Sequence, residues 1–281
     1  MGVLEMETES VWSLPFVQAF IRTCEDGWLQ GWHERNGGNL SYRLTEAETV
    51  AVQPWVQEPG PWQEIGVSVP ELAGEYFLVT GSGKYFRNVP LDPADTLALI
   101  EVDETGTQYR ILEGLVNGGR PTSELPTHLM NHAVKKTATG GTSRVIYHAH
   151  PANIVALTYV LPLTSEAFTR ELWEMETECP VVFPQGIGVV GWMVPGGAAI
   201  AEATAELMKT YDAAVWAHHG MFCAGPDLDT TFGLMHTIEK AAEILVKVRS
   251  MVPEKRQTIT PDQFRDLAKA FGVTLPEKYL Q

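Results

Sequence analysis

Short strand-like runs alternate with helical segments along the whole chain, and this alternation restricts the fold more than any other feature. Phe16, Phe20, Cys24 and Trp28 recur every four residues, which is typical of a helix with one apolar face over residues 15–32. We expect further helices over residues 123–136, 153–160, 198–209 and 230–251, and after a capping box at 260–263. Strand-like runs occupy residues 39–44, 76–80, 98–102, 108–112, 144–150, 179–183, 188–192 and 213–218, whereas residues 45–74 indicate an irregular or hairpin-like excursion. Strands mixed with helices throughout predict an α/β fold whose sheet is covered on both faces.

Length and charge narrow the class of protein further. The chain has 281 residues, of which 44% are hydrophobic, so it can bury a substantial core. It contains no internal repeat, low-complexity tract or obvious linker, and we therefore expect a single domain over residues 1–281. The net charge of -15 argues against binding to nucleic acid or to an anionic membrane, because both require clustered positive charge.

Cysteine usage and the N-terminal sequence indicate a cytoplasmic protein. Cys24, Cys179 and Cys223 lie far apart in mostly apolar contexts, without a disulfide framework or a CxxC motif. Residues 1–13 are acidic and lack a basic region followed by an apolar stretch. The sequence also lacks an apolar run of about eighteen residues that could span a bilayer.

Two histidines close the strand-like run at 144–150. His148 and His150 project from the same face of a strand and can share one metal ion, while Ala149 points the other way. An isolated pair of this kind is equally consistent with two hydrogen-bonded histidines. The run at 213–218 ends in His218, which His219 follows. Only one of these two histidines can be the third metal ligand, because neighbouring strand residues point in opposite directions. Three imidazoles favour a transition-series ion such as Zn²⁺ and leave coordination positions for a substrate.

Three loops combine glycine with hydroxyl or amide side chains, at residues 36–39, 80–84 and 121–123. Glycine lets backbone N–H groups approach a phosphate closely, and the third loop precedes a predicted helix whose N-terminus favours anions. Each loop taken alone is more typical of an ordinary turn or cap. Together they predict a binding site for a phosphorylated small molecule.

Glu124 directly follows the third loop, in the first turn of the predicted helix. A carboxylate there is an ordinary helix-start residue, but beside a phosphate loop it is also a candidate acid/base group. His128 and His132 follow on the same helical face and form a competing metal constellation with Glu124. Because the first and third turns lie about 12 Å apart, at 1.5 Å per residue, we expect both histidines to be packing or polar-face residues.

Several of these motifs together resemble one known family. They are Glu34-Arg-Asn-Gly-Gly-Asn39, Val79-Thr-Gly-Ser-Gly-Lys84, Pro121-Thr-Ser-Glu124, His148-x-His150 and His219-Gly220. In order and spacing they are similar to the class II aldolase/adducin family, with similarity running from the first predicted helix to the last. Residues 46–71 are hard to match.

The resemblance implies a three-layer α/β/α fold with a central, largely antiparallel sheet. It also implies a ring-shaped homotetramer with active sites at the subunit boundaries, and a sugar-phosphate substrate. One Zn²⁺ per chain is expected on His148, His150 and His219, since the family's third ligand directly precedes a glycine.

The same resemblance assigns roles to further residues. Glu124 is implied as the catalytic carboxylate, and Glu178 as a carboxylate that each subunit donates to its neighbour's site. Phosphate is expected to contact Asn36, Gly38, Asn39, Ser82, Gly83, Thr122 and Ser123.

The activity implied is reversible, metal-dependent aldol cleavage of a sugar phosphate, without a lysine Schiff base. Other family members are fuculose-phosphate aldolases, sugar-phosphate 4-epimerases or sugar-phosphate dehydratases, which activate the carbon next to a carbonyl with the same metal and phosphate contacts. Adducin-like members are non-catalytic binding modules. Stoichiometric metal argues against a binding module, and the identity of the product separates the enzymes.

Overall fold

The structure is a computed structural model that describes residues 10–281, so most of the acidic N-terminal stretch lies outside the described residues. Within them, nine strands form one sheet in the order β2-β5-β4-β3-β1-β6-β9-β8-β7. All neighbouring pairs are antiparallel except β7 and β8, which are parallel. The strands are β1 (Asn39–Arg43), β2 (Gln63–Glu64), β3 (Tyr76–Thr80), β4 (Leu97–Val102), β5 (Gln108–Gly114), β6 (Val145–Ala149), β7 (Gly188–Val190), β8 (Ala213–Trp216) and β9 (Gly220–Gly225). The predicted α/β class with a largely antiparallel sheet is confirmed.

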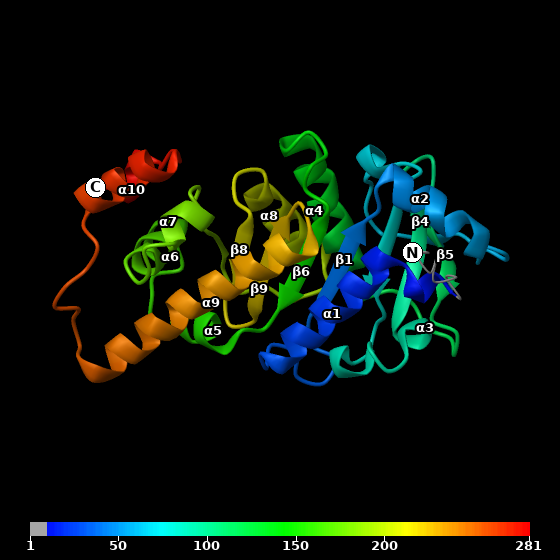
Figure 1. The fold of residues 1–281 in the computed structure, drawn as a ribbon, viewed down its shortest axis with the longest axis horizontal. Helices are drawn as coiled ribbons and strands as arrows, with labels where there is room; N and C mark the ends of the chain where they lie inside the picture. The colour runs from blue at the N-terminus through cyan, green and yellow to red at the C-terminus, as the bar shows by residue number, and fades with distance from the viewer. Residues whose placement is uncertain (1–9) are drawn as a thin grey trace, which may run out of the picture.

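Helices cover both faces of this sheet. Figure 1 shows α1 and α9 crossing one face, while α4 and α8 pack against each other on the opposite face. The helices α6, α7 and α10 lie beyond the sheet, at the end of the molecule that carries the C-terminus. The helices are α1 (Pro15–Leu29), α2 (Glu46–Val52), α3 (Pro93–Thr96), α4 (Leu125–Ala138), α5 (Ala152–Leu157), α6 (Ser165–Trp173), α7 (Cys179–Val182), α8 (Ala198–Met208), α9 (Leu228–Met251) and α10 (Pro261–Phe271).

The central strand β6 is buried on both faces, which explains its continuous apolar sequence. Val145, Tyr147 and Ala149 join the core under α1 and α9, whereas Ile146 joins a separate core on the other face. Because side chains alternate along a strand, His148 faces the same side as Ile146. The helix pair α4 and α8 therefore covers the face of the sheet from which His148 projects.

Several elements differ from the sequence prediction. Residues 179–183 were expected to form a strand, but α7 begins at Cys179, because Pro180 suits the first turn of a helix and cannot donate to a strand ladder. The segment 45–74 contains α2, which the capping box of Thr45 and Glu48 initiates. Strand β9, between two glycines, was not predicted. No helix within residues 10–281 is both long and apolar enough to cross a bilayer.

Candidate metal centre

Three histidines from two adjacent strands meet at one end of the sheet. His148 is the fourth residue of β6, His150 directly follows that strand, and His219 lies in the turn between β8 and β9. One ring nitrogen from each lies within 4.8 Å of the other two, and the Nε2 atoms of His148 and His219 are 3.4 Å apart. Burial lowers the pKa of His219 to about 4, and that of His148 well below its ordinary value. These two imidazoles are therefore neutral near pH 7, which is the protonation state that binds a metal.

Hydrogen bonds fix which ring nitrogen of His148 and His150 faces the centre. The Nδ1–H of His148 donates to the carbonyl oxygen of Met221 at 3.1 Å, which leaves its Nε2 without a hydrogen. The Nδ1–H of His150 donates to the Glu34 carboxylate at 2.7 Å, and its buried Nε2 has no hydrogen-bond partner among residues 10–281. Carboxylate or carbonyl partners of this kind orient metal-bound histidines and strengthen them as ligands. The residues present therefore fit a divalent transition metal held by three imidazoles.

The backbone separates His218 from His219. His218 adopts a left-handed conformation, with a φ of 62°, so the chain turns sharply between the two strands. Its backbone N–H donates to the hydroxyl of Thr158 at 3.0 Å, and its exposed ring lies against Tyr159. The structure thus places His219, and not His218, with the other two histidines.

Gly220 allows the two histidine-bearing strands to approach each other. A Cβ at this position would lie 2.3 Å from the carbonyl oxygen of Ala149 and 2.9 Å from the His150 ring. No other residue fits without moving one of the strands. The His219-Gly220 pair thus combines a ligand position with the close packing that brings this ligand to the other two.

Glu124 lies beside the histidine cluster, at the N-cap of α4. Its Oε2 atom is 3.7 Å from Nε2 of His148 and accepts a hydrogen bond from the side-chain amide of Asn39 at 2.8 Å. Burial raises the pKa of Glu124, and the hydrogen bond from Asn39 offsets part of this rise. A buried carboxyl group with a raised pKa is suited to accept and return a proton near neutral pH.

The three predicted anion loops come together at the same end of the sheet. Asn39 pairs with His148 across β1 and β6, and the N–H of Leu40 donates to the hydroxyl of Thr80 at 3.1 Å. The loops at 80–84 and 121–123 are joined by a bridge between Gly81 and Pro121 and by the hydrogen bond from the Thr122 N–H to the Thr80 carbonyl at 2.9 Å. The first turn of α4 adds few free donors, because the N–H of Leu125 donates to the Thr122 carbonyl at 3.0 Å and Pro126 has no N–H.

The seven expected phosphate contacts differ in exposure. Asn36, Gly83 and Ser123 are exposed, and the side chains of Asn39 and Thr122 are buried, while Gly38 and Ser82 are intermediate. The only lysine of these loops, Lys84, has its ammonium on Asp95 at 2.7 Å. The loops therefore offer neutral donors to an anion.

Glu178 is not part of this cluster within one chain. It is exposed and lines a separate pocket of about 290 Å³ with Glu176, His236 and Lys240. None of the three clustered histidines lines that pocket. A role for Glu178 at a metal centre therefore requires a second copy of the chain.

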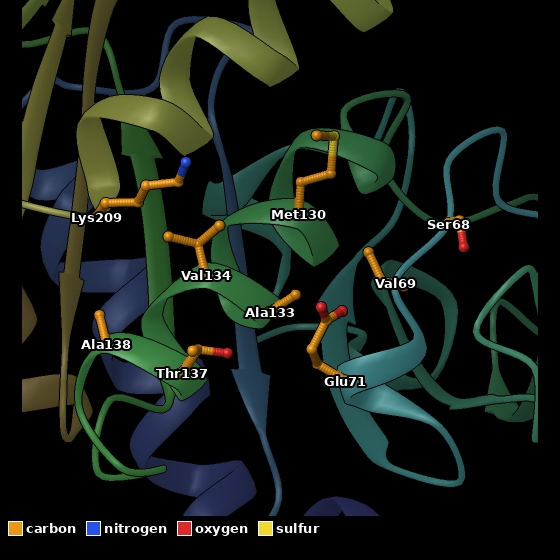
Figure 2. Close-up of a pocket in the computed structure, with 9 residues that line it drawn as sticks. All are labelled: Ser68, Val69, Glu71, Met130, Ala133, Val134, Thr137, Ala138 and Lys209. Carbon is orange, nitrogen blue, oxygen red and sulfur yellow. The ribbon is translucent and has the colours of Figure 1, made fainter.

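Another cavity, of about 460 Å³, lies on the outer side of α4. Figure 2 shows Met130, Ala133 and Val134 of this helix between Val69 on one side and Lys209, which directly follows α8, on the other. Its lining is largely apolar and includes none of the histidines. It is a site distinct from the histidine cluster and lacks its chemistry.

Comparison with known proteins agrees with this arrangement. Residues 18–246 match the family described as "Class II Aldolase and Adducin N-terminal domain". The chain belongs to this family. It is 55% identical over 259 residues to a rhamnulose-1-phosphate aldolase of Mannheimia succiniciproducens, covering 92% of this chain and 95% of the relative. It is 52% identical over 274 residues to the enzyme of that name from Pectobacterium atrosepticum, covering 97% and 99% of the two chains.

Solved structures of class II aldolases share the fold. A sugar-phosphate aldolase from Thermotoga maritima superposes with a TM-score of 0.70 at 32% identity, covering 84% of this chain and 95% of that one. An L-fuculose 1-phosphate aldolase, at 18% identity, gives a TM-score of 0.59 and covers 91% and 95% of the two chains. The predicted family is therefore confirmed, together with its three-layer architecture.

Sequence reasoning on this class II aldolase missed the partners that orient the metal-site histidines. Glu34 opens the glycine-rich loop motif, and this position, next to a predicted anion loop, was the only available signal for it. The carbonyl of Met221 has no signal in sequence, because any residue supplies a backbone oxygen. The stacking of Phe222 on His148, with ring centroids 4.2 Å apart, depends on the pairing of β6 with the unpredicted β9.

Proposed function

We propose that this protein catalyses the reversible retro-aldol cleavage of L-rhamnulose 1-phosphate to dihydroxyacetone phosphate and L-lactaldehyde, with one Zn²⁺ per chain. The observation that carries the proposal is the convergence of three imidazoles beside the buried carboxyl group of Glu124. Relatives at 55% and 52% identity that carry this activity in their names support the choice of substrate.

His148, His150 and His219 would hold the ion. When bound, Zn²⁺ supplies a Lewis acid that stabilises the negative charge developing on the ketose oxygens during cleavage. The loops at 36–39, 80–84 and 121–123 would bind the phosphate, with contacts from Asn36, Gly38, Asn39, Ser82, Gly83, Thr122 and Ser123. Binding of the phosphate would position the carbon chain of the sugar next to the carboxyl group of Glu124.

Glu124 acts on the proton at C3 in this mechanism. After C3–C4 cleavage, C3 of the three-carbon fragment must gain a proton, and in the condensation direction it must lose one. Burial raises the pKa of Glu124 and so brings the free energies of its two protonation states closer together at neutral pH, which favours reversible transfer. Asn39 holds one carboxylate oxygen, and the other oxygen remains available to the substrate.

Glu178 would act at the aldehyde end, in proton transfer to and from the C4 hydroxyl, in the site of a neighbouring subunit. Its exposed position in a pocket apart from the histidines supports this assignment in a homotetramer with sites at the subunit boundaries. Each active site would then be composed of residues from two chains.

A pair of variants tests both carboxylates. We expect Glu124→Gln to keep near-normal zinc content and to lose at least about a hundredfold in kcat, because an amide cannot move a proton. We expect Glu178→Gln to lose activity as well, with zinc unchanged. Co-assembled Glu124→Gln and Glu178→Gln chains should regain roughly a quarter of wild-type activity, because sites with both native carboxylates form across mixed boundaries.

Activity and zinc content of the separate and mixed proteins are the measurements. Near-wild-type turnover by Glu124→Gln would refute its role. If both single variants are inactive and mixing restores nothing, Glu178 does not act between subunits.

A further inference from the structure

A chain of buried polar side chains runs from Glu124 into the interior, beneath α4. Asn39 donates to Glu124 at 2.8 Å, and its side-chain oxygen bonds to Nε2 of His128. The hydroxyl of Ser41 lies 2.6 Å from Nδ1 of His128 and 2.8 Å from Nε2 of His132. Ser41, His128 and His132 are at most 1% exposed.

Only one direction of hydrogen bonding satisfies this chain when Glu124 is ionised. A carboxylate can only accept, so Asn39 must turn its NH2 group toward Glu124 and its oxygen toward His128. The Nε2 of His128 then carries the hydrogen, and its bare Nδ1 accepts from the hydroxyl of Ser41. That hydroxyl oxygen accepts in turn from the Nε2–H of His132.

Both histidines are neutral, as this arrangement requires. Burial lowers the pKa of His128 to about 3 and that of His132 well below its ordinary value. The Nδ1 of His132 has no partner within residues 10–281, which suits a ring nitrogen without a hydrogen better than an N–H group. His132, Ser41 and His128 therefore form a directed series of donors that ends at Asn39.

We propose that His128, its tautomer fixed by Ser41 and His132, is a positioning residue that holds the amide of Asn39 in one orientation and thereby aims Glu124 at the reacting carbon. Without the donor on His128, the amide of Asn39 can rotate by a half-turn and present its oxygen to Glu124. The carboxylate would then lose its hydrogen bond and its fixed place 3.7 Å from His148. The role of Glu124 in catalysis is taken from the proposed function, on which this inference rests.

The first experiment compares three variants of the zinc-loaded protein. His128→Phe keeps the size of the ring but has neither donor nor acceptor. His128→Gln places an amide N–H close to the position of the imidazole Nε2–H and serves as the conservative variant. Leu129→Ala removes an equally buried side chain on α4 that belongs to an apolar core cluster with Leu125 and Ala133, and is the control for lost packing.

We expect His128→Phe to lower kcat on the order of ten- to hundredfold, with KM near the wild-type value. The position of the Glu124 carboxyl group affects the transition state more than it affects substrate binding. His128→Gln should recover most of kcat, and Leu129→Ala should lower thermal stability but leave kcat unchanged. Unchanged kcat in His128→Phe would overturn the proposal. So would a rise in KM without a fall in kcat, which would mean that the chain supports the phosphate loop instead.

A second experiment does not depend on any substrate or on metal-supported turnover. Nitrogen NMR of histidine-labelled protein distinguishes a protonated ring nitrogen from a bare one. We expect His128 and His132 both to carry their hydrogen on Nε2 at neutral pH, and Ser41→Ala, which removes only a hydroxyl, to abolish the single tautomer of His128. If His128 carries its hydrogen on Nδ1, the positioning role is excluded, even if rhamnulose phosphate is cleaved. If the tautomers are as expected but no sugar phosphate is cleaved, the proposed function fails instead.

Discussion

His218 and His219 are adjacent in the chain but have different surroundings. His219 lies with its Nε2 3.4 Å from that of His148, whereas the exposed ring of His218 lies against Tyr159. A left-handed residue at 218, with a φ of 62°, causes this separation. Chemical identity alone therefore does not make a histidine a ligand, and the local backbone decides which of the two faces the centre.

This pair allows a matched test of the metal ligands. Asparagine tolerates left-handed backbone and is a poor zinc ligand, so the same substitution can be made at both positions. We expect His219→Asn to lower zinc affinity by more than about a hundredfold, since removing a partner of a ligand already costs ten- to hundredfold. His218→Asn should bind one Zn²⁺ per chain like the wild type. Elemental analysis after dialysis against a graded chelator measures both, and equal zinc retention by the two variants would contradict the assignment.

At the scale of elements, the close approach of β6 and β9 creates the site. Their antiparallel pairing places His148 opposite Phe222, and the carbonyl of the preceding residue, Met221, orients the His148 ring. Gly220 begins β9 at the point where a side chain would collide with the backbone of β6. The positions of the three clustered histidines thus depend on a close contact between strands, to which Gly220 contributes only its lack of a side chain.

Alanine substitutions at two glycines distinguish the loss of this strand contact from the general effect of replacing glycine by alanine. We expect Gly220→Ala to destabilise the fold by about 1–3 kcal/mol and to weaken zinc binding, because its Cβ would lie 2.3 Å from the carbonyl oxygen of Ala149. Gly233 lies inside α9, where an added Cβ meets nothing within 4 Å. Gly233→Ala should therefore stabilise the protein by about 0.5–1 kcal/mol. Urea denaturation of both variants measures the change, and a stability of Gly220→Ala equal to wild type would count against the strand contact.

The sequence predicted most of these elements, and the exceptions have physical causes. Strand β3 was predicted to the residue, since its apolar run ends at a glycine turn. Residues 179–183 were misassigned because a short apolar run has no distinct period, and Pro180 was not weighed. His128 and His132 were expected to be packing or polar-face residues, but their part in the buried polar chain depends on Ser41 of strand β1, far away in the sequence. Such tertiary partners have no signal in the spacing of one segment.

For the whole molecule, the burial that keeps His33 and His128 neutral also makes the stability of the fold sensitive to acid. Burial lowers the pKa of both His33 and His128 from 6.5 to about 3. Below about pH 6.5 each of these two histidines is protonated in the unfolded chain but stays neutral in the folded chain. Stability therefore falls as pH decreases, and this loss continues until the pH reaches the folded pKa near 3.

We expect each of these two histidines to contribute about 1.4 kcal/mol per pH unit to this loss between pH 6 and pH 4. The glutamine of His128→Gln cannot be protonated, so this variant should lack the contribution of His128 to the loss of stability. Urea denaturation of wild type and His128→Gln at several pH values, both as zinc-free protein, measures the difference in slope. Identical slopes would show that His128 is not kept neutral by the fold.

The most direct test of the account is an assay of dihydroxyacetone phosphate released by the purified protein, before and after removal of its metal by a chelator. L-rhamnulose 1-phosphate is the substrate, with L-fuculose 1-phosphate and L-ribulose 5-phosphate for comparison. We expect release that favours rhamnulose phosphate, stops on chelation and returns with added Zn²⁺. Protein that binds one Zn²⁺ per chain but releases nothing from any of the three sugars would contradict the aldolase assignment and leave only the metal centre.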